Sequence, residues 1–480
     1  MISLNTAGLQ SGSYAGTITI SDPAAADSPR FVYINLEIYA PGATRPPFGY
    51  MDTPLDGLAG IEGSIPVTGW ALDDVGVAAV KIYRDRAASD PDGSPEMIYL
   101  GDAVFVEGAR PDVELAYPNF PMKTRAGYGY MMLTNFLPNQ GNGTFRIHAV
   151  AVDQEGQSTF LGTKTIACDN ASAVLPFGAI DIPAQGGTAS GSSFLNFAWV
   201  LTPMPKMIPP DGSTITAWVD GLPVGQPSYG YYRVDIATLF PGYANANGAI
   251  GFIPLDTTKY PNGVHAIVWS ATDSAGVNNG FGSRFFTILN AGPGGGSLDL
   301  AENPEFPLEY AKDLKGIPAD IWTPVYTRRG FGKDGPAEAV YPGPDGVGRI
   351  DMPEVSRIAV YLNYESAIET REESAAKIVE LNPPSSPFRK GGDNNPFSSG
   401  LWKGDGEHYA AYQIVGGEFR PLPIGASFDS ERGVFYWQPG PGFLGEYDFV
   451  FATGDPRSSR HAKAMKIVIM PTEKHYAAVR

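Results

Sequence analysis

Short stretches of alternating apolar and polar residues recur along the chain. They include "AAVKIYRD" (78–85), "GTFRIHAVAVD" (143–153) and "GVHAIVWSATD" (263–273), in which successive residues fall on opposite faces. This period of two is typical of half-buried β-strands. The last two stretches follow Asn-Gly turns and end at Asp-x-x-Gly turns, which reverse the chain. The pattern predicts an all-β fold of antiparallel β-sandwiches.

One region has a different period. The stretch "YESAIETREESAAKIVELN" (364–382) places acidic residues first and apolar residues at helical spacing, which predicts a helix. We therefore expect residues 366–400 to form one helix and a loop. The preceding residues, 298–365, have the turn-rich pattern of a small β unit. Together they predict a small mixed insert before the last sandwich.

Two parts of the chain repeat each other. "RPDVELAYPNFP" (110–121) matches "RVDIATLFPGYA" (233–244), and "PFGYMDTP" (47–54) matches "PFGAIDIP" (176–183). The spacing between the copies drifts slightly, as expected when loops vary and strands do not. We conclude that one domain is duplicated, as residues 45–169 and 174–290. The equivalent pairs are Arg110 and Arg233, Asp112 and Asp235, and Trp70 and Trp199.

The duplicated domains resemble the bacterial Ig-like modules of large secreted or surface proteins. The similarity rests on "TGWALDDVGVAAVKIYRD" (68–85) and on the strand pairs that end in Ala-x-Asp-x-x-Gly. It implies tandem antiparallel Ig-like β-sandwiches. It also implies a role as a spacer, an adhesin or a carbohydrate-associated accessory domain.

Both flanks carry similar resemblances. Residues 401–475 contain "LPIGASFDSERGVFYWQPGPGFLGEYDFVFATGD", which resembles the putative-Ig, cadherin-like modules of bacterial surface proteins. Residues 1–41 resemble the last two strands of a BACON-type Ig-like domain. Two strands alone are marginally stable. We therefore expect this segment to pack on its neighbour, to pair with another chain, or to be the cut end of a longer protein.

Composition narrows the class of protein. The 480 residues carry a net charge of −17 and a pI near 4.7, which argues against nucleic-acid partners because phosphate binding needs a basic surface. The sequence contains one cysteine, so an intrachain disulfide is excluded. No apolar run is long enough to span a bilayer. No signal peptide is recognisable, so either the protein is cytosolic or the chain is a piece of something longer. We expect an extracellular or cell-surface bacterial protein.

Four groups of residues could carry chemistry. The repeated Arg-x-Asp pairs predict a structural role, either as ion pairs or with the aspartate capping a short helical turn, and calcium contact is the alternative. Trp70 and Trp199 predict core positions. Asp73, Asp74 and Asp153 are the candidate calcium ligands, with solvated loops as the alternative reading. Tyrosines beside glycines could stack on sugars or fill the core. These are Tyr128, Tyr130, Tyr229, Tyr231 and Tyr232.

No catalytic signature is present in the sequence, so we expect no enzyme and no cofactor other than calcium. The sequence therefore predicts a structural or adhesive component of a bacterial surface or extracellular assembly, whose partners are other protein subunits or surface glycans. One alternative is a carbohydrate-binding accessory protein. Another is a filament subunit that forms homo-oligomers by adding residues 1–41 to a neighbour's sheet.

Overall fold

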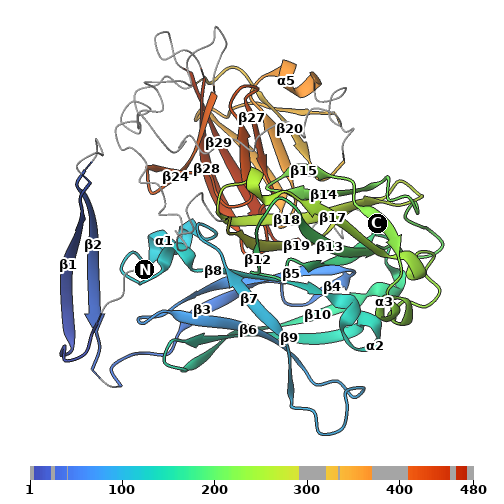
Figure 1. Cartoon of the computed structure of the whole chain (residues 1–480), viewed down its shortest axis with the longest axis horizontal. Helices are drawn as coiled ribbons and strands as arrows, with labels where there is room; N and C mark the ends of the chain where they lie inside the picture. Colours follow the sequence, from blue (N-terminus) through green and yellow to red (C-terminus); the bar gives the residue numbers. More distant parts are fainter. Residues whose placement is uncertain are drawn as a thin grey trace.

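The computed structural model describes residues 5–22, 28–40, 42–290, 320–332, 336–369, 409–453 and 461–472. Strands dominate these residues and are arranged in three β-sandwiches and one separate hairpin (Figure 1). The fold class is therefore all-β, as the alternating sequence pattern predicts.

The first duplicated domain, which we call module 1 (residues 45–169), forms one continuous eight-stranded arrangement in the order β3-β5-β8-β7-β6-β9-β10-β4. Strand β7 joins the two layers, because it pairs with β6 up to Ala103 and with β8 at Val104 and Phe105. The buried core lies between the layers. The strands are β3 (Phe48–Thr53), β4 (Leu58–Ile61), β5 (Ser64–Leu72), β6 (Val77–Asp85), β7 (Met97–Phe105), β8 (Gly127–Leu133), β9 (Asn142–Asp153) and β10 (Ser158–Asp169), and the short helices are α1 (Pro111–Ala116) and α2 (Pro138–Gly141).

The second domain, module 2 (residues 174–290), repeats this order in two sheets, β11-β13-β17-β16 and β12-β19-β18-β14-β15. The position of β7 is taken by two shorter strands, β15 and β16, so the layers are no longer joined by one strand. The strands are β11 (Phe177–Ile182), β12 (Thr188–Ala189), β13 (Phe194–Leu201), β14 (Ile215–Val219), β15 (Leu222–Gly225), β16 (Ser228–Tyr231), β17 (Ile250–Leu255), β18 (Gly263–Thr272) and β19 (Asn278–Ile288), with the helix α3 (Val234–Leu239).

The third sandwich corrects the expected division of the C-terminal half. Residues 320–369 and 409–472 contribute to the same two sheets, β21-β20-β23-β27-β26 and β22-β29-β28-β24-β25, instead of forming a small β unit and a separate module. We call this unit the C-terminal sandwich. Its elements are β20 (Val325–Arg329), β21 (Glu338–Val340), β22 (Val347–Pro353), β23 (Ile358–Tyr361), α5 (Tyr364–Glu369), β24 (Tyr409–Val415), β25 (Glu418–Arg420), β26 (Ala426–Asp429), β27 (Val434–Trp437), β28 (Gly445–Thr453) and β29 (His461–Met470).

Only the start of the expected helix lies within the described residues. Helix α5 covers Tyr364–Glu369. Residues 370–408, which hold the rest of the expected helix and loop, lie outside the described residues.

The three sandwiches pack on one another and do not form an extended string (Figure 1). The C-terminal sandwich shares one buried cluster with Val106 and Ala109 of module 1 and with Ala266 and Phe285 of module 2. The Tyr447 hydroxyl donates a hydrogen bond of 2.5 Å to the Ala109 carbonyl. Apolar burial of this kind is the main stabilising contribution to such an interface.

The N-terminal hairpin, β1 (Gly12–Ile20) and β2 (Arg30–Ile38), stands apart at one side of Figure 1. Its two strands pair antiparallel with each other and belong to no larger sheet. No residue of either strand is fully buried.

Candidate functional site

The repeated Arg-x-Asp motif forms the same charged bridge in both modules. Arg110 donates to Asp112 through Nε and Nη2, at 2.9 and 2.7 Å, and its Nη1 reaches Asp52 on β3. In module 2, the Arg233 Nε lies 2.7 Å from the Asp235 Oδ1, and its Nη1 reaches Asp181. The arginine therefore joins the short helix to the first strand of its sandwich. This supports the structural reading of the motif.

Sequence reasoning missed Asp52 and Asp181 as the second partners. Their signal was the repeated Phe-Gly-x-x-Asp-x-Pro stretch, which was used only as evidence of duplication. Burial raises the pKa of the Asp52 carboxyl and outweighs the opposing effect of Arg110. The hydrogen bond from Arg233 lowers the pKa of the more exposed Asp235. The arginine–aspartate bridge is therefore more deeply buried in module 1 than in module 2.

The repeated aromatic residues form a matching cluster in each module. Trp70 and Phe48 have ring centroids 5.8 Å apart, and Trp199 and Phe177 have centroids 6.0 Å apart. Trp199 is 1% exposed, whereas Trp70 is half-buried. The ring centroids of Phe136 in module 1 and Trp199 are 6.1 Å apart, so module 1 helps to bury this tryptophan of module 2. The other rings of the clusters are Tyr117 and Phe120 in module 1 and Phe240 and Tyr243 in module 2.

The candidate calcium ligands lie in two adjoining loops of module 1. The Asp73 Oδ2 accepts hydrogen bonds from the amides of Val75 and Gly76 at 2.8 and 2.9 Å. The Asp153 Oδ1 accepts from the amides of Glu155 and Gln157, both at 2.8 Å. Asp73 and Asp153 are only 1% and 2% exposed. Each therefore uses one oxygen to shape its own turn.

The second oxygens of these carboxylates have no donor. The Asp73 Oδ1, the Asp74 Oδ1 and the Asp153 Oδ2 are all buried without a hydrogen-bond partner. Burial raises the pKa of Asp73, and the negative charges of Asp74 and Asp153 raise it further. Buried polar atoms without partners are costly, so this group of oxygens requires an explanation.

The five candidate tyrosines do not share one surface. Tyr128 is fully buried, the Tyr130 hydroxyl donates to the Leu100 carbonyl at 2.9 Å, and the Tyr229 hydroxyl donates to the Val200 carbonyl at 2.9 Å. Tyr231 and Tyr232 are 49% and 62% exposed. Tyr231 and Tyr232 are therefore the most exposed of the five.

Gly129, next to Tyr128, lies where the C-terminal sandwich approaches module 1. A Cβ atom at Gly129 would lie 2.0 Å from the Pro441 carbonyl oxygen of the C-terminal sandwich. Strand register makes Gly129 equivalent to Phe252 in module 2, because they face Thr68 and Phe197 respectively. The glycine allows the C-terminal sandwich to approach the backbone of β8 closely.

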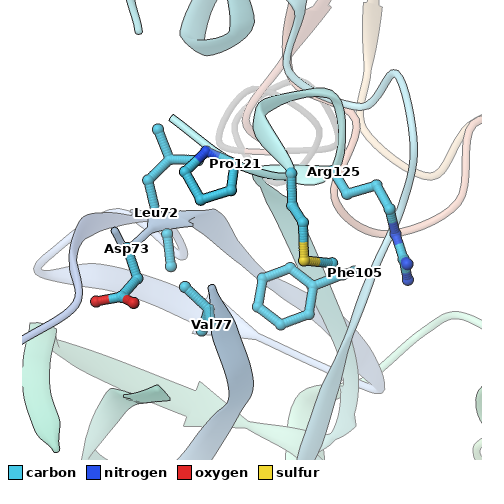
Figure 2. Close-up of a pocket in the computed structure, with 8 residues that line it drawn as sticks. Leu72, Asp73, Val77, Phe105, Pro121 and Arg125 are labelled. Atoms are coloured by element: carbon cyan, nitrogen blue, oxygen red, sulfur yellow. The ribbon is translucent and has the colours of Figure 1, made fainter. Parts of the chain in front are cut away.

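The hollows found in the described residues are small. The one in Figure 2 lies between Asp73 and Val77 on one side and Phe105 and Arg125 on the other. Its interior space is about 10 Å³, which is room for about one water molecule. The thiol of Cys168 is buried, and burial raises its pKa to about 12, which leaves it protonated and unreactive at neutral pH.

The hairpin presents a different kind of surface. Cross-strand pairs on one face are Tyr14 with Leu36 and Ile18 with Val32, so this face is continuously apolar, and the opposite face exposes Tyr33 at 76%. Both outer edges lack a neighbouring strand in the described sheets. A two-stranded sheet with an apolar face and two open edges is only marginally stable by itself.

No protein-family model matches the chain, and no curated protein matches it. Solved β-sandwich structures are similar at low identity. The fibronectin(III)-like modules of Clostridium thermocellum CbhA are 15% identical, over 51% of this chain and 95% of that chain, with a TM-score of 0.17. The N-terminal eight Ig domains of Down Syndrome Cell Adhesion Molecule are 9% identical, over 96% of this chain and 39% of that chain, with a TM-score of 0.20.

A 1.5-MDa bacterial ice-binding adhesin is 10% identical, over 85% of this chain and 92% of that chain, with a TM-score of 0.15. We base no functional argument on similarities of this size. The fold class rests on the strand pairing itself. Within the described ranges, no helix combines the length and apolar content needed to cross a bilayer.

Proposed function

We propose that this protein is a structural, adhesive component of an extracellular or cell-surface assembly, and that its N-terminal hairpin joins it to a second copy of the chain. The observation that carries this proposal is the hairpin itself, with one apolar face and two open edges. The three packed sandwiches supply the body to which the hairpin is attached.

Strand addition supplies what the hairpin lacks. An isolated pair of strands is marginally stable in water, and open edges pair readily with strands of another chain. The segment between β2 and β3 contains "PGATRPP", and proline-rich linkers are semi-rigid spacers. Such a linker holds the hairpin away from its own sandwiches, where it can reach another molecule.

The test compares the full chain with a chain that lacks residues 1–41, by light scattering after size-exclusion chromatography over a range of concentrations. We expect concentration-dependent oligomers from the full chain and a monomer from the truncated chain. A matched variant, Ile18→Asp with Val32→Asp, keeps the length but charges the apolar face, and it should also be monomeric. Monomers from the unmodified full chain would contradict the proposal.

A second candidate is glycan binding, favoured by the exposure of Tyr231 and Tyr232 beside Phe252, whose ring centroid lies 5.1 Å from that of Tyr231. Aromatic faces of this kind stack on apolar surfaces of ligands. Binding to a glycan array should be lost in the variant Tyr231→Ala with Tyr232→Ala. Glycan binding that is unchanged in the double variant would exclude Tyr231 and Tyr232 as the binding site. The buried Tyr128 could not replace them, because it offers no face to a ligand.

A further inference from the structure

Module 1 and module 2 differ at one equivalent pair of loops in a way that points to a cation. In module 2, Asp273 takes the position of Asp153, and its Oδ1 accepts hydrogen bonds from the amides of Ala275 and Val277 at 2.9 and 3.1 Å. The turn is therefore built in the same way in both modules. The second oxygen of the carboxylate is where they differ.

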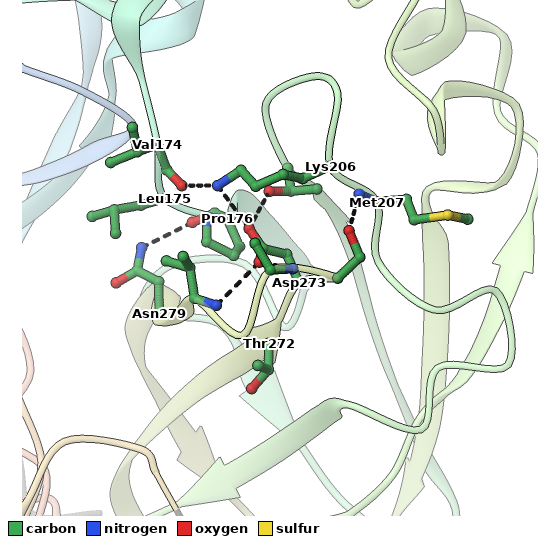
Figure 3. Close-up of polar contacts among 12 residues, drawn as sticks. Val174, Leu175, Pro176, Lys206, Met207, Thr272, Asp273 and Asn279 are labelled. Atoms are coloured by element: carbon green, nitrogen blue, oxygen red, sulfur yellow. Dashed lines mark hydrogen bonds and ion pairs between the residues drawn. The ribbon is translucent and has the colours of Figure 1, made fainter.

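Module 2 supplies its own positive charge at that oxygen. The Lys206 Nζ lies 2.8 Å from the Asp273 Oδ2, and the Thr202 hydroxyl donates to the same oxygen at 2.9 Å. Figure 3 shows the lysine reaching over the loop from the adjacent segment to this carboxylate. Asp273 is 4% exposed, so the buried carboxylate is fully paired.

Module 1 has carboxylates where module 2 has donors. Counted from the matched tryptophans, Asp73 occupies the position of Thr202, and Asp74 occupies the position of Pro203. The Asp153 Oδ2 therefore meets more negative charge and no hydroxyl or ammonium group. Three carboxylate oxygens remain buried without a donor. Their mutual repulsion would be relieved by a cation between them or by a proton shared between two of them.

We propose that module 1 binds a calcium ion between the Asp73–Asp74 loop and the Asp153 loop, in the place that the Lys206 ammonium occupies in module 2. Calcium is a hard cation that takes carboxylate and carbonyl oxygens from neighbouring loops in flexible geometry. Magnesium demands a stricter octahedron and dehydrates reluctantly. Oxygen donors alone suit calcium better than zinc or copper, which favour nitrogen and sulfur ligands.

The side chains alone do not complete the site. Among the described residues, no three His, Cys, Asp or Glu side chains are already arranged around one metal position. The ion must therefore draw the carboxylates closer and take further oxygens from backbone carbonyls and water, which is usual for loop-bound calcium.

The site also adjoins the linker to the hairpin. The Arg45 amide donates to the Asp74 Oδ2 at 3.0 Å, and the Gln157 side-chain amide donates to the Thr44 hydroxyl at 3.2 Å. An ion held by these loops would fix the linker at the point where it enters module 1. This consequence rests on the proposed function, whereas calcium binding itself does not.

The experiment measures calcium binding by isothermal titration calorimetry and the melting temperature by differential scanning calorimetry, on the full chain after treatment with a chelator. We expect one site per chain and a rise in Tm of about 5 °C at saturating calcium. The variant Asp153→Asn should lose the heat of binding and the Tm response. It should melt above the calcium-free parent, because its amide can donate to a neighbouring carboxylate.

Asp273→Asn is the matched control, because it changes the equivalent residue in module 2 and should leave the calcium response intact. If the chain gives no heat of calcium binding but becomes more stable on mild acidification, the carboxylates share a proton instead of an ion. That result would overturn the proposal. A Tm rise that magnesium reproduces and Asp153→Asn retains would be screening of the net charge of −17, which also overturns it. If the full chain binds calcium but forms no oligomers, only the proposed function is contradicted.

Discussion

The two modules share an inner frame and differ in what covers it. In both, an arginine bridges two aspartates, and a tryptophan packs against a phenylalanine from the first strand. In module 1, the Glu114 carboxylate of α1 pairs with Arg420 of the C-terminal sandwich at 2.7 and 3.0 Å. In module 2, Val234 of the equivalent α3 is 65% exposed. Duplication preserved the packing that the fold needs, and the outer surfaces diverged with their contacts.

A large effect should come from Gly129→Ala in module 1. The new Cβ would lie 2.0 Å from a backbone oxygen of Pro441, and neither side can move without shifting a strand or loop. We expect a loss of about 3 kcal/mol or more, measured by urea unfolding. The equivalent change in module 2, Phe252→Ala, should cost about 1 kcal/mol because it only trims a partly exposed ring. Equal losses would contradict the difference drawn between the two modules.

A smaller difference should separate Arg110→Ala from Arg233→Ala. The Arg110 side chain is 9% exposed and that of its partner Asp52 is 19% exposed, against 29% and 34% for Arg233 and Asp181. Removing Arg110 leaves a largely buried carboxylate without its partner, which should cost about 3 kcal/mol. Removing Arg233 should cost about 1 kcal/mol, because water can reach Asp181. Calorimetric melting of both variants measures the contrast, and a reversed order would refute it.

The third effect depends on pH and belongs to the boundary between module 1 and the C-terminal sandwich. Glu354 is 4% exposed, and its carboxylate accepts a hydrogen bond from the Thr53 hydroxyl at 3.2 Å. Burial, with a smaller contribution from the charge of Asp52, raises its pKa from 4.5 to about 8. Between these two pH values the native state binds one proton more than the unfolded state. Stability contributed by this group is full below about pH 4.5 and is lost as the pH rises through 8.

The expected slope is about 1.4 kcal/mol for each pH unit over that interval. Glu354→Gln imitates the protonated carboxyl, so the variant should gain on the parent chain as the pH rises from 5 to 8. Urea midpoints at four pH values measure this. Parallel curves for the two proteins would show that Glu354 titrates normally.

The sequence was sufficient for features whose signal is local. Strand alternation predicted the all-β fold, and the repeated Arg-x-Asp predicted an ion pair. The C-terminal sandwich was not predicted as one unit, because β22 pairs with β29 across more than a hundred residues. Such long-range pairing leaves no trace in a local period. The role of Gly129 was missed for the same reason, since its cause is the distant Pro441.

The candidate site was predicted only in its composition. Asp73, Asp74 and Asp153 could be selected from loop position and charge. The sequence does not show that backbone amides donate to one oxygen of Asp73 and of Asp153. Those hydrogen bonds leave the other oxygen of each carboxylate buried and without a donor. Lys206, which pairs with Asp273, could not be identified as its partner from the sequence because the two residues lie 67 positions apart.

The parallel pairing of β22 with β29 determines how the C-terminal sandwich would carry tension. Strand β29 is held between β22 on one side and the antiparallel β28 on the other. A pull along β29 would load both rows of hydrogen bonds together and in shear, so they would have to break as a group. In the proposed assembly, this arrangement would let the C-terminal sandwich resist tension along β29.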